Sequence, residues 1–245
     1  MKADPQSQQR LLELQAIDTS LAQLAHRRRT LPELAELDRL TRELTALDDD
    51  RVRAQVGVDD LDRDIARIEK DVEQVRQRAD RDRSRLDAGP GPAKELVAQQ
   101  HELGTQTPRQ NELEDAQLEL MEQREAAQST LDDVLGRVET LRATRAETEA
   151  RRDAALSGVD SETVAKTEAR APLVGQLPAD LVRLYEKVRE STGMGAAMLR
   201  FGRCEGCRLE LSGSEKARVR AADPDEVVQC EECRRILVRT EASGL

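Results

Sequence analysis

Aromatic residues are almost absent from this chain. Its 245 residues include one tyrosine, one phenylalanine and no tryptophan. A compact globular domain of this length normally buries several aromatic side chains, so a single large globular core is not expected. Charged residues make up 36% of the chain, and the apolar residues among them are mainly Leu, Val, Ala and Ile. Such a composition is typical of long helices or of a coiled coil.

Long apolar runs are also missing. No stretch approaches the ~20 apolar residues that a membrane span requires. Residues 1–10 are polar and lack the apolar segment of a signal peptide. No nucleotide-binding loop, dinucleotide fingerprint or nucleophile–base set is found, so we expect a protein that is not an enzyme. Residues 201–245 carry 8 Lys/Arg and 9 Asp/Glu, and this balance does not predict strong non-specific binding to nucleic acid.

Cysteine is scarce, and its placement is informative. The four cysteines form two C-x-x-C pairs near the C-terminus: Cys204, Cys207, Cys230 and Cys233. This spacing predicts one structural zinc ion held by four thiolates, a closed site with no ligand position left for catalysis. Two disulfides or an iron site would use the same residues and remain alternatives. Thiol pairs suited to a metal, without an export signal, predict a cytoplasmic protein.

Apolar residues recur with helical spacing through most of the first 150 residues. The most regular tract runs from Leu61 through Ile65, Ile68 and Val72 to Val75, in alternating steps of four and three. Such steps place the apolar side chains on one seam of a coiled coil. A similar pattern occupies residues 93–141. The sequence therefore predicts two long helical arms.

The two arms are separated by the segment 87–92, which contains two glycines and two prolines and cannot continue a helix. A short connection favours antiparallel packing of the arms. With the turn near residue 90, we expect three apolar pairs across the seam: Ile68–Leu113, Leu61–Leu120 and Leu44–Leu135.

Three further segments predict interruptions of the helices. Pro32 in the segment 30–33 suggests a kink or short break. In the segment 104–108, Thr107 and Pro108 read as an N-cap and a first helical residue, so the second arm is expected to restart there. Residues 157–178 lose the periodicity and contain Pro172, which predicts a linker or elbow.

The C-terminal part predicts a short helix opened by Pro178, followed by a zinc ribbon. The expected ribbon has a strand at 196–203, a return at Leu209 and Leu211, a helix capped by Ser212, and a strand at 236–238. The fold class is thus mainly α: a long antiparallel coiled-coil helical hairpin followed by a small four-cysteine zinc ribbon (α+β). The expected domains are 1–170, with the hairpin turn near 87–93, and 171–245, with the elbow helix and the ribbon.

Arginines cluster around the two cysteine pairs and are candidates for a partner-binding surface. They are Arg200, Arg203, Arg208, Arg234, Arg235 and Arg239. Guanidinium groups suit phosphates and carboxylates, so nucleic acid and acidic protein are both candidate partners. The alternative is that these arginines only solubilise a small domain.

Several of these segments resemble one bacterial family, the coiled-coil proteins with a C4-type zinc ribbon. The resemblance lies in Gly193-Met194-Gly195, in the segment 203–207 and in the segment 230–237. It covers nearly the whole chain and is most specific over residues 178–240. It implies zinc ligation by the four cysteines, and partners that are RNA or protein, since members are best known as flagellar or sigma-factor-associated adaptors.

The leading hypothesis is a non-enzymatic adaptor that presents a zinc ribbon on a coiled coil, with a protein partner bound through the ribbon or the coiled coil. A homodimer is a further option. One alternative is a nucleic-acid-binding regulator that acts through the ribbon arginines. Another is a factor that inserts its coiled-coil tip into RNA polymerase. Such factors hold magnesium with acidic residues at the tip, whereas this tip carries only Asp87.

Overall fold

The structure is a computed structural model that describes residues 1–89 and 91–244. Its described residues form two compact units, Met1–Leu34 with Ala150–Leu245, and Ala35–Glu149. The domain division expected at residue 170 stays a prediction. The elements are α1 (Pro5–Arg29), α2 (Pro32–Asp87), α3 (Ala93–Gly175), α4 (Ala179–Thr192), β1 (Ala196–Arg200), β2 (Arg203–Cys204), α5 (Gly213–Ala221), β3 (Val228–Gln229), β4 (Ile236–Val238) and a 3₁₀ turn, η1 (Glu241–Ser243).

The expected break at residues 30–33 is confirmed. Helix α1 starts behind Asp4, whose carboxylate accepts a hydrogen bond from the Ser7 N–H at 2.9 Å. It ends at Arg29, and the Thr30 N–H turns back to the carbonyl of Arg27 at 3.2 Å. Helix α2 begins at Pro32, where a missing N–H costs nothing because the first turn has no intrahelical acceptor.

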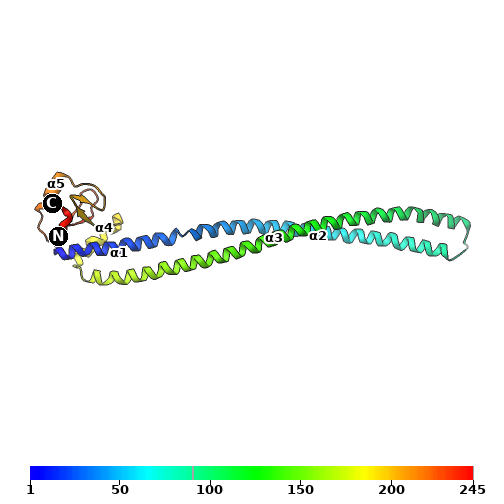
Figure 1. Cartoon of the computed structure of the whole chain (residues 1–245), viewed down its shortest axis with the longest axis horizontal. Helices are drawn as coiled ribbons and strands as arrows, with labels where there is room; N and C mark the ends of the chain where they lie inside the picture. The colour runs from blue at the N-terminus through cyan, green and yellow to red at the C-terminus, as the bar shows by residue number, and fades with distance from the viewer. Residues whose placement is uncertain (90, 245) are drawn as a thin grey trace. The chain divides into compact units, whose positions relative to one another are not determined.

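Helices α2 and α3 form the antiparallel hairpin that the sequence predicts, and they lie side by side in Figure 1. Ion pairs join them along the unit Ala35–Glu149, including Arg78–Glu102 at 2.7 Å and Arg124–Asp62 at 3.0 Å. Each of these exposed pairs contributes about 0–1 kcal/mol. The apolar seam therefore supplies most of the stabilisation. Pro90, which belongs to the predicted turn at 87–92, lies outside the described residues.

The predicted register of the hairpin is wrong at one end. Leu135 was expected to face Leu44, but its side chain is 43% exposed. Leu44 and Leu141 instead pack against the buried cluster of Leu47, Val134 and Val138. The neighbouring residue Val134, together with Val138, meets this part of α2 in place of Leu135, so the face of α3 in the seam differs by one position from the predicted one. The pairs Ile68–Leu113 and Leu61–Leu120 stay predictions.

The predicted restart of the second arm at Thr107 and Pro108 is also wrong, because α3 runs through this segment without a break. The Thr107 hydroxyl does not cap a helix but donates to the Leu103 carbonyl at 3.2 Å. Thr105 donates to the Glu102 carbonyl in the same way, at 2.8 Å. These hydroxyls bond to the preceding helical turn, and the seam holds the helix together despite the proline.

The linker expected at residues 157–178 is mostly helix. α3 continues to Gly175 and contains Pro172, and only residues 176–178 separate it from α4. The local sequence of this stretch does not reveal that it packs against α1, and this packing keeps it helical. Arg28 of α1 pairs with Asp160, and Arg170 pairs with Asp18 at 2.7 Å. The helix that Pro178 was expected to open is confirmed as α4.

The zinc-ribbon region is a small sheet of four short strands in the order β2-β1-β4-β3. β1 is antiparallel to β2 and parallel to β4, while β3 is antiparallel to β4. The single strand expected at 196–203 is two strands, because Phe201 and Gly202 turn the chain between them. The expected return at Leu209 and Leu211 is reduced to one isolated bridge, Arg203 to Glu210.

The first residues of the chain complete this sheet edge, and Figure 1 draws the N-terminus beside the ribbon. Lys2 forms a bridge with Glu226, the Ala3 N–H donates to the Asp225 carbonyl at 2.7 Å, and the Val227 N–H donates to the Met1 carbonyl at 3.0 Å. The Lys2 ammonium also pairs with Asp223 at 3.1 Å. No feature of the local sequence predicts this pairing.

A buried polar network fastens α1 to α4 and to the start of β1. The Tyr185 hydroxyl, fully buried, donates to Asp18 at 2.7 Å. Gln15 accepts hydrogen bonds from the N–H groups of Gly195 at 2.7 Å and Ala196 at 3.2 Å. Burial raises the pKa of Asp18, but the hydrogen bonds from Arg170 and Tyr185 outweigh burial and keep the pKa below its ordinary value.

Around this network lies the apolar core of the unit Met1–Leu34 with Ala150–Leu245. It combines residues from both ends of the chain: Ala3, Leu11, Leu14, Leu177, Leu181, Tyr185, Ala196, Ile236 and Val238. Fully burying a leucine contributes about 1.5–3 kcal/mol, so Leu11 and Leu14 of α1 stabilise the ribbon side of the unit substantially. In the described ranges no helix is both long and apolar enough to cross a membrane.

We predict that Gly195→Ala destabilises this unit. A Cβ at residue 195 would lie 2.5 Å from the Tyr185 ring and 2.7 Å from the Tyr185 carbonyl oxygen, and such overpacking costs roughly 1–3 kcal/mol. Thermal unfolding followed by circular dichroism measures the loss. Gly158→Ala is the matched control, because its Cβ meets nothing within 4 Å inside α3; it should stabilise by about 0.5–1 kcal/mol. Equal effects of the two changes would contradict the packing argument.

We also predict that Pro108→Ala stabilises the α2–α3 hairpin. A proline inside a helix removes one hydrogen bond and crowds the carbonyl four residues earlier, at a cost of about 3 kcal/mol. Amide hydrogen exchange near Gly104 should slow when the bond is restored. Pro92→Ala, at the start of α3, is the control and should change exchange little. Unchanged exchange around residue 104 in Pro108→Ala would show that the helix already accommodates the proline without cost.

Candidate metal centre

The two C-x-x-C segments fold into two turns with the same backbone hydrogen bonds. The Cys204 N–H donates to the Leu209 carbonyl at 3.0 Å, and the Cys230 N–H donates to the Arg235 carbonyl at 3.0 Å. After each pair the chain enters the left-handed region, at Arg208 with φ 62° and at Arg234 with φ 60°. This bend aims both sulfurs of a pair to the same side.

The four sulfur atoms meet in one cluster whose dimensions fit a single zinc ion. All four lie within 4.8 Å of one another. The Cys204 and Cys233 sulfurs are 3.8 Å apart, and those of Cys207 and Cys230 are 3.9 Å apart. A tetrahedron with zinc–sulfur bonds of about 2.3 Å requires sulfurs about 3.8 Å apart. Disulfide sulfurs would be bonded at about 2.05 Å, and all four cysteines are free thiols.

The surroundings of the cluster supply both burial and hydrogen bonds. Cys204 and Cys230 are buried in the second apolar core, which also contains Leu199, Val219 and Leu237. Burial raises the pKa of Cys204 to about 11 and also raises the pKa of Cys230. The N–H groups of Gly206 and Cys207 donate toward the Cys204 sulfur and oppose this shift. Such donors stabilise thiolates once a cation neutralises them.

Gly206 and Arg235 form a close contact beside the first cysteine pair. A Cβ at Gly206 would lie 2.7 Å from Cδ of Arg235 and 2.9 Å from the Ala197 methyl. The Arg235 guanidinium passes over this glycine and donates to the Thr192 carbonyl at 3.1 Å, which belongs to the last residue of α4. Arg235 therefore connects the second cysteine pair to the first pair and to α4.

The Arg239 side chain also forms hydrogen bonds within the ribbon. Its guanidinium donates to five backbone carbonyls, those of Val219, Ala222, Asp223, Pro224 and Glu226. These contacts hold the end of α5 and the following loop against β4. Of the six arginines predicted to bind a partner, Arg235 and Arg239 thus have structural contacts that account for them.

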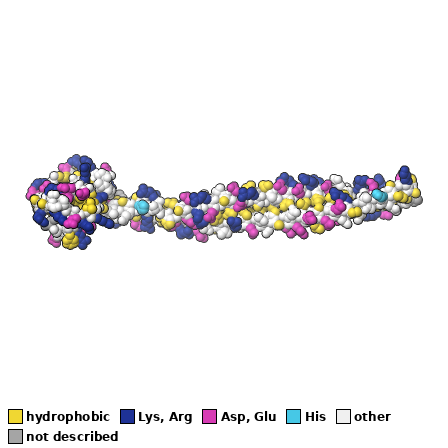
Figure 2. Space-filling model, turned by 90° about the horizontal axis from the view of Figure 1, so that it is seen from above, with side chains coloured by type: hydrophobic (Ala, Val, Ile, Leu, Met, Phe, Trp, Pro, Cys, Tyr) yellow, Lys and Arg dark blue, Asp and Glu magenta, His cyan; other side chains and the backbone are white. Residues whose placement is uncertain are grey.

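The other four arginines, Arg200, Arg203, Arg208 and Arg234, are exposed. Across residues 1–89 and 91–244, none of these four guanidiniums lies within ion-pair distance of a carboxylate. The structure thus brings a group of exposed guanidiniums without ion pairs and the four cysteines into one unit. Figure 2 shows basic and acidic side chains interspersed over the surface.

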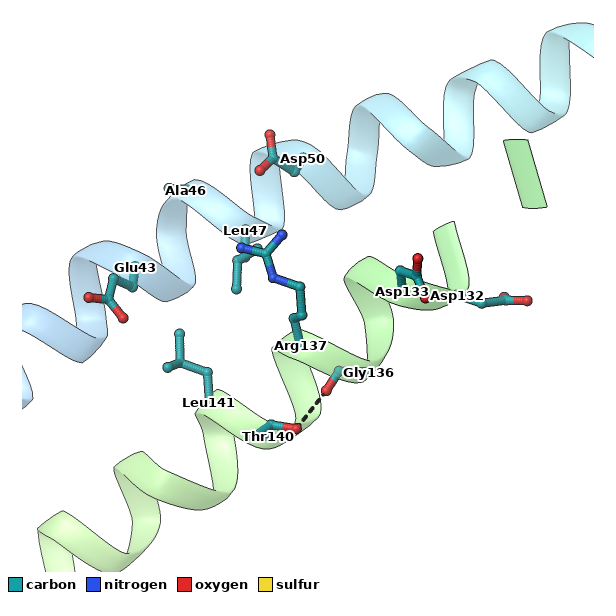
Figure 3. Close-up of a pocket in the computed structure, with 10 residues that line it drawn as sticks. All are labelled: Glu43, Ala46, Leu47, Asp50, Asp132, Asp133, Gly136, Arg137, Thr140 and Leu141. Atoms are coloured by element: carbon teal, nitrogen blue, oxygen red, sulfur yellow. Dashed lines mark hydrogen bonds between the residues drawn. The ribbon is translucent and has the colours of Figure 1, made fainter. Parts of the chain in front are cut away.

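A hollow on the hairpin carries acidic groups, but we assign no site to it. Figure 3 shows Glu43 and Asp50 on α2 and Arg137 reaching across from α3. The carboxylates already have partners on their own helices, since Glu43 pairs with Arg39 at 2.5 Å and Asp50 pairs with Arg53. Carboxylates paired in this way are the ordinary solvated surface of a coiled coil.

Comparison with known proteins agrees with this geometry. The model of the CT398-like coiled-coil hairpin domain matches residues 14–193. The chain belongs to this family. The model of the C4-type zinc ribbon domain matches residues 203–237, which include all four cysteines. Together with the sulfur geometry, this match makes the cluster a single C4-type zinc site and excludes the disulfide reading.

Relatives of similar length share both parts of the chain. "Uncharacterized protein Rv2229c" of Mycobacterium tuberculosis is 39% identical, over 98% of each chain. A solved structure from Mycobacterium smegmatis is 39% identical, covers 98% of this chain and 100% of its own, and has a TM-score of 0.87. CT398 from Chlamydia trachomatis is 18% identical, covers 95% and 97%, and has a TM-score of 0.66; at this identity it supports the fold alone.

We predict that chelation removes one zinc ion per chain and unfolds the ribbon, while most of the helical signal remains. The helices of Ala35–Glu149 have their own apolar seam, which includes Leu47, Val134 and Val138. Zinc must displace the thiol protons, and burial raises the pKa of Cys204 and Cys230, so the zinc affinity should fall as pH falls below neutral. Elemental analysis and a colorimetric zinc assay at several pH values measure both effects. The control is Cys204→Ser, which should bind zinc weakly at every pH. A native protein without zinc would contradict the prediction.

Proposed function

We propose that this zinc-binding coiled-coil protein is a non-enzymatic adaptor whose ribbon binds a partner macromolecule. The observation that carries the proposal is a set of four exposed guanidiniums: Arg208 and Arg234 directly follow the two cysteine pairs, and Arg200 and Arg203 flank the β1–β2 turn. A metal site with four protein ligands stabilises a fold and offers no position for a substrate. Both matching families are non-catalytic domains, a coiled-coil hairpin and a zinc ribbon.

The distribution of roles among the arginines supports a binding surface over a merely solubilising one. Arg235 and Arg239 use their donors on backbone carbonyls, at distances from 2.6 to 3.4 Å. Arg208 and Arg234 follow the two cysteine pairs at equivalent left-handed positions, where asparagine or glycine would be less strained. Neither cation forms an ion pair within residues 1–89 and 91–244, so both are available to an anionic partner.

An acidic protein surface is the partner that we favour. Nucleic acid is the second candidate, because free arginines also suit phosphate. Single-stranded nucleic acid usually stacks on several aromatic side chains, whereas the sequence of the ribbon contains only one aromatic residue, Phe201. We also propose a cytoplasmic location, where thiolates stay reduced. The flagellar or sigma-factor association that the family resemblance implies stays a prediction, as does a homodimer.

We predict that the double variant Arg208→Asn with Arg234→Asn loses partners without loss of zinc. Asparagine tolerates the left-handed backbone, so the charge is removed with little added strain. Proteins and nucleic acids cross-linked to the full chain in its native cells would be quantified by mass spectrometry and sequencing. We expect recovery of the specific partner to fall by about tenfold, which corresponds to roughly 1.4 kcal/mol.

The matched control is Arg27→Asn with Arg29→Asn, which removes two exposed charges at the end of α1. It should leave recovery unchanged. Nuclease treatment separates the two partner classes, since a protein contact survives it. A nucleic-acid partner would instead show a salt dependence that flattens by about one unit for each phosphate contact removed. Equal recovery with both double variants would show that the ribbon arginines are only a solvated surface.

A further inference from the structure

The turn between β1 and β2 exposes the only phenylalanine of the chain. The Phe201 side chain is 73% exposed, more than any other large hydrophobic side chain in the described residues. Its aromatic area is therefore in water, although the adjacent apolar core has Leu199 fully buried two residues earlier. Exposed aromatics next to arginines are typical of the residues that dominate binding energy at protein interfaces.

The backbone at this turn is unfavourable for phenylalanine. Phe201 has φ +47° and Gly202 has φ +68°, so a two-residue loop joins the paired residues Arg200 and Arg203 with both loop residues left-handed. Tight hairpin loops of this kind favour Asn-Gly, because bulky side chains are strained at positive φ. Strain of this kind persists where the surrounding structure enforces it, and it is concentrated at functional sites.

The surrounding structure does enforce it. The Phe201 N–H donates to the Ala242 carbonyl at 2.9 Å, and the Gly202 N–H donates to the Ser243 carbonyl at 2.8 Å. The Ser243 hydroxyl donates to the Leu199 carbonyl at 3.1 Å. The 3₁₀ turn η1 thus fixes the loop from outside. A side chain presented by a rigid loop loses little conformational entropy on binding.

The charges around the ring are mostly positive. The Arg200 guanidinium lies over the Phe201 ring, 5.6 Å from its centroid. Arg200, Phe201 and Arg203 line one hollow together with Glu205 and Glu210. Lys216 neutralises Glu210 through an ion pair at 2.5 Å, so two arginines face one unpaired carboxylate.

We propose that this turn, through Phe201, Arg200 and Arg203, docks an acidic protein segment that carries an aliphatic side chain. The inference rests on the proposed adaptor function and names the chemistry of its partner. The ring takes the aliphatic group, and the two arginines take the carboxylates. A single-stranded nucleic acid fits less well, because such strands stack on several successive aromatics and this ribbon offers one.

The strain allows a test that separates a binding role from a packing role. In Phe201→Asn the new side chain suits the left-handed backbone, so the midpoint of thermal unfolding should rise by about 2–4 °C. A packing residue would lower it on replacement. The same variant should bind the partner segment at least tenfold more weakly. Val164→Asn is the matched control, since Val164 is 57% exposed on α3, and its affinity should equal that of the unaltered chain.

Since the chain has no tryptophan, Phe201→Trp provides a single fluorescent reporter at the turn. The probe is a short synthetic peptide rich in Asp and Glu with one Leu. A second peptide has Ser in place of Leu, a third has Lys in place of the acids, and oligo(dT) represents single-stranded nucleic acid. We expect a saturable blue shift of emission with the first peptide, a weaker response with the second and none with the third.

The outcomes decide between the two proposals. No saturable shift with the acidic Leu peptide, tighter binding of oligo(dT), or equal affinity of Phe201→Asn and the unaltered chain would each overturn docking at this turn. The adaptor function would still stand if Arg208→Asn with Arg234→Asn lost its cross-linked partners. If that variant also kept them, both proposals would fail.

Discussion

The four sulfur atoms are the constraint on which the ribbon depends. Its strands are two to five residues long, and strands this short are only marginally stable without another source of cohesion. Each cysteine turn is attached directly to a strand. The first turn begins at Cys204, the last residue of β2, and the second turn leads into β4, which begins at Ile236. Holding the turns together therefore helps to set the register of the strands. Removing the metal charge would leave buried thiols in a core too small to order the sheet by itself.

The metal centre alone does not complete the ribbon unit. α1 covers it with Leu11 and Leu14, and Gln15 satisfies the N–H groups at the entry to β1. Tyr185 fills the space that Gly195 leaves free. One contact therefore explains both Tyr185 and Gly195. It is the close approach of α4 to β1, the strand that leads toward the first cysteine pair.

The sequence predicted the features that depend on local chemistry. The cysteine spacing identified the zinc ligands, the glycines and prolines at 87–92 marked the hairpin turn, and Pro32 marked the break between α1 and α2.

Features that depend on distant partners were missed or misjudged. The sequence around Asp18 does not reveal that Arg170 and Tyr185 donate hydrogen bonds to it. The sequence around Arg239 does not reveal that its guanidinium donates to five backbone carbonyls. Pro108 and Pro172 were read as breaks because local propensity ignores the packing of a neighbouring helix. Phe201 directly precedes Gly202, and a residue followed by glycine is a common signal for a tight hairpin loop. The sequence thus offered one hint that Phe201 lies in an exposed turn.

The contacts of residues 1–3 with the loop at 223–227 also bear on how this protein folds. They join residues more than two hundred positions apart, whereas the helices of the hairpin need only local contacts and one turn to form. The hairpin then returns the chain to its starting point and spares the final pairing most of the entropy of closing a loop of more than two hundred residues. We therefore expect the pairing of residues 1–3 with residues 225–227 to form late in folding, after the helices of the hairpin have packed.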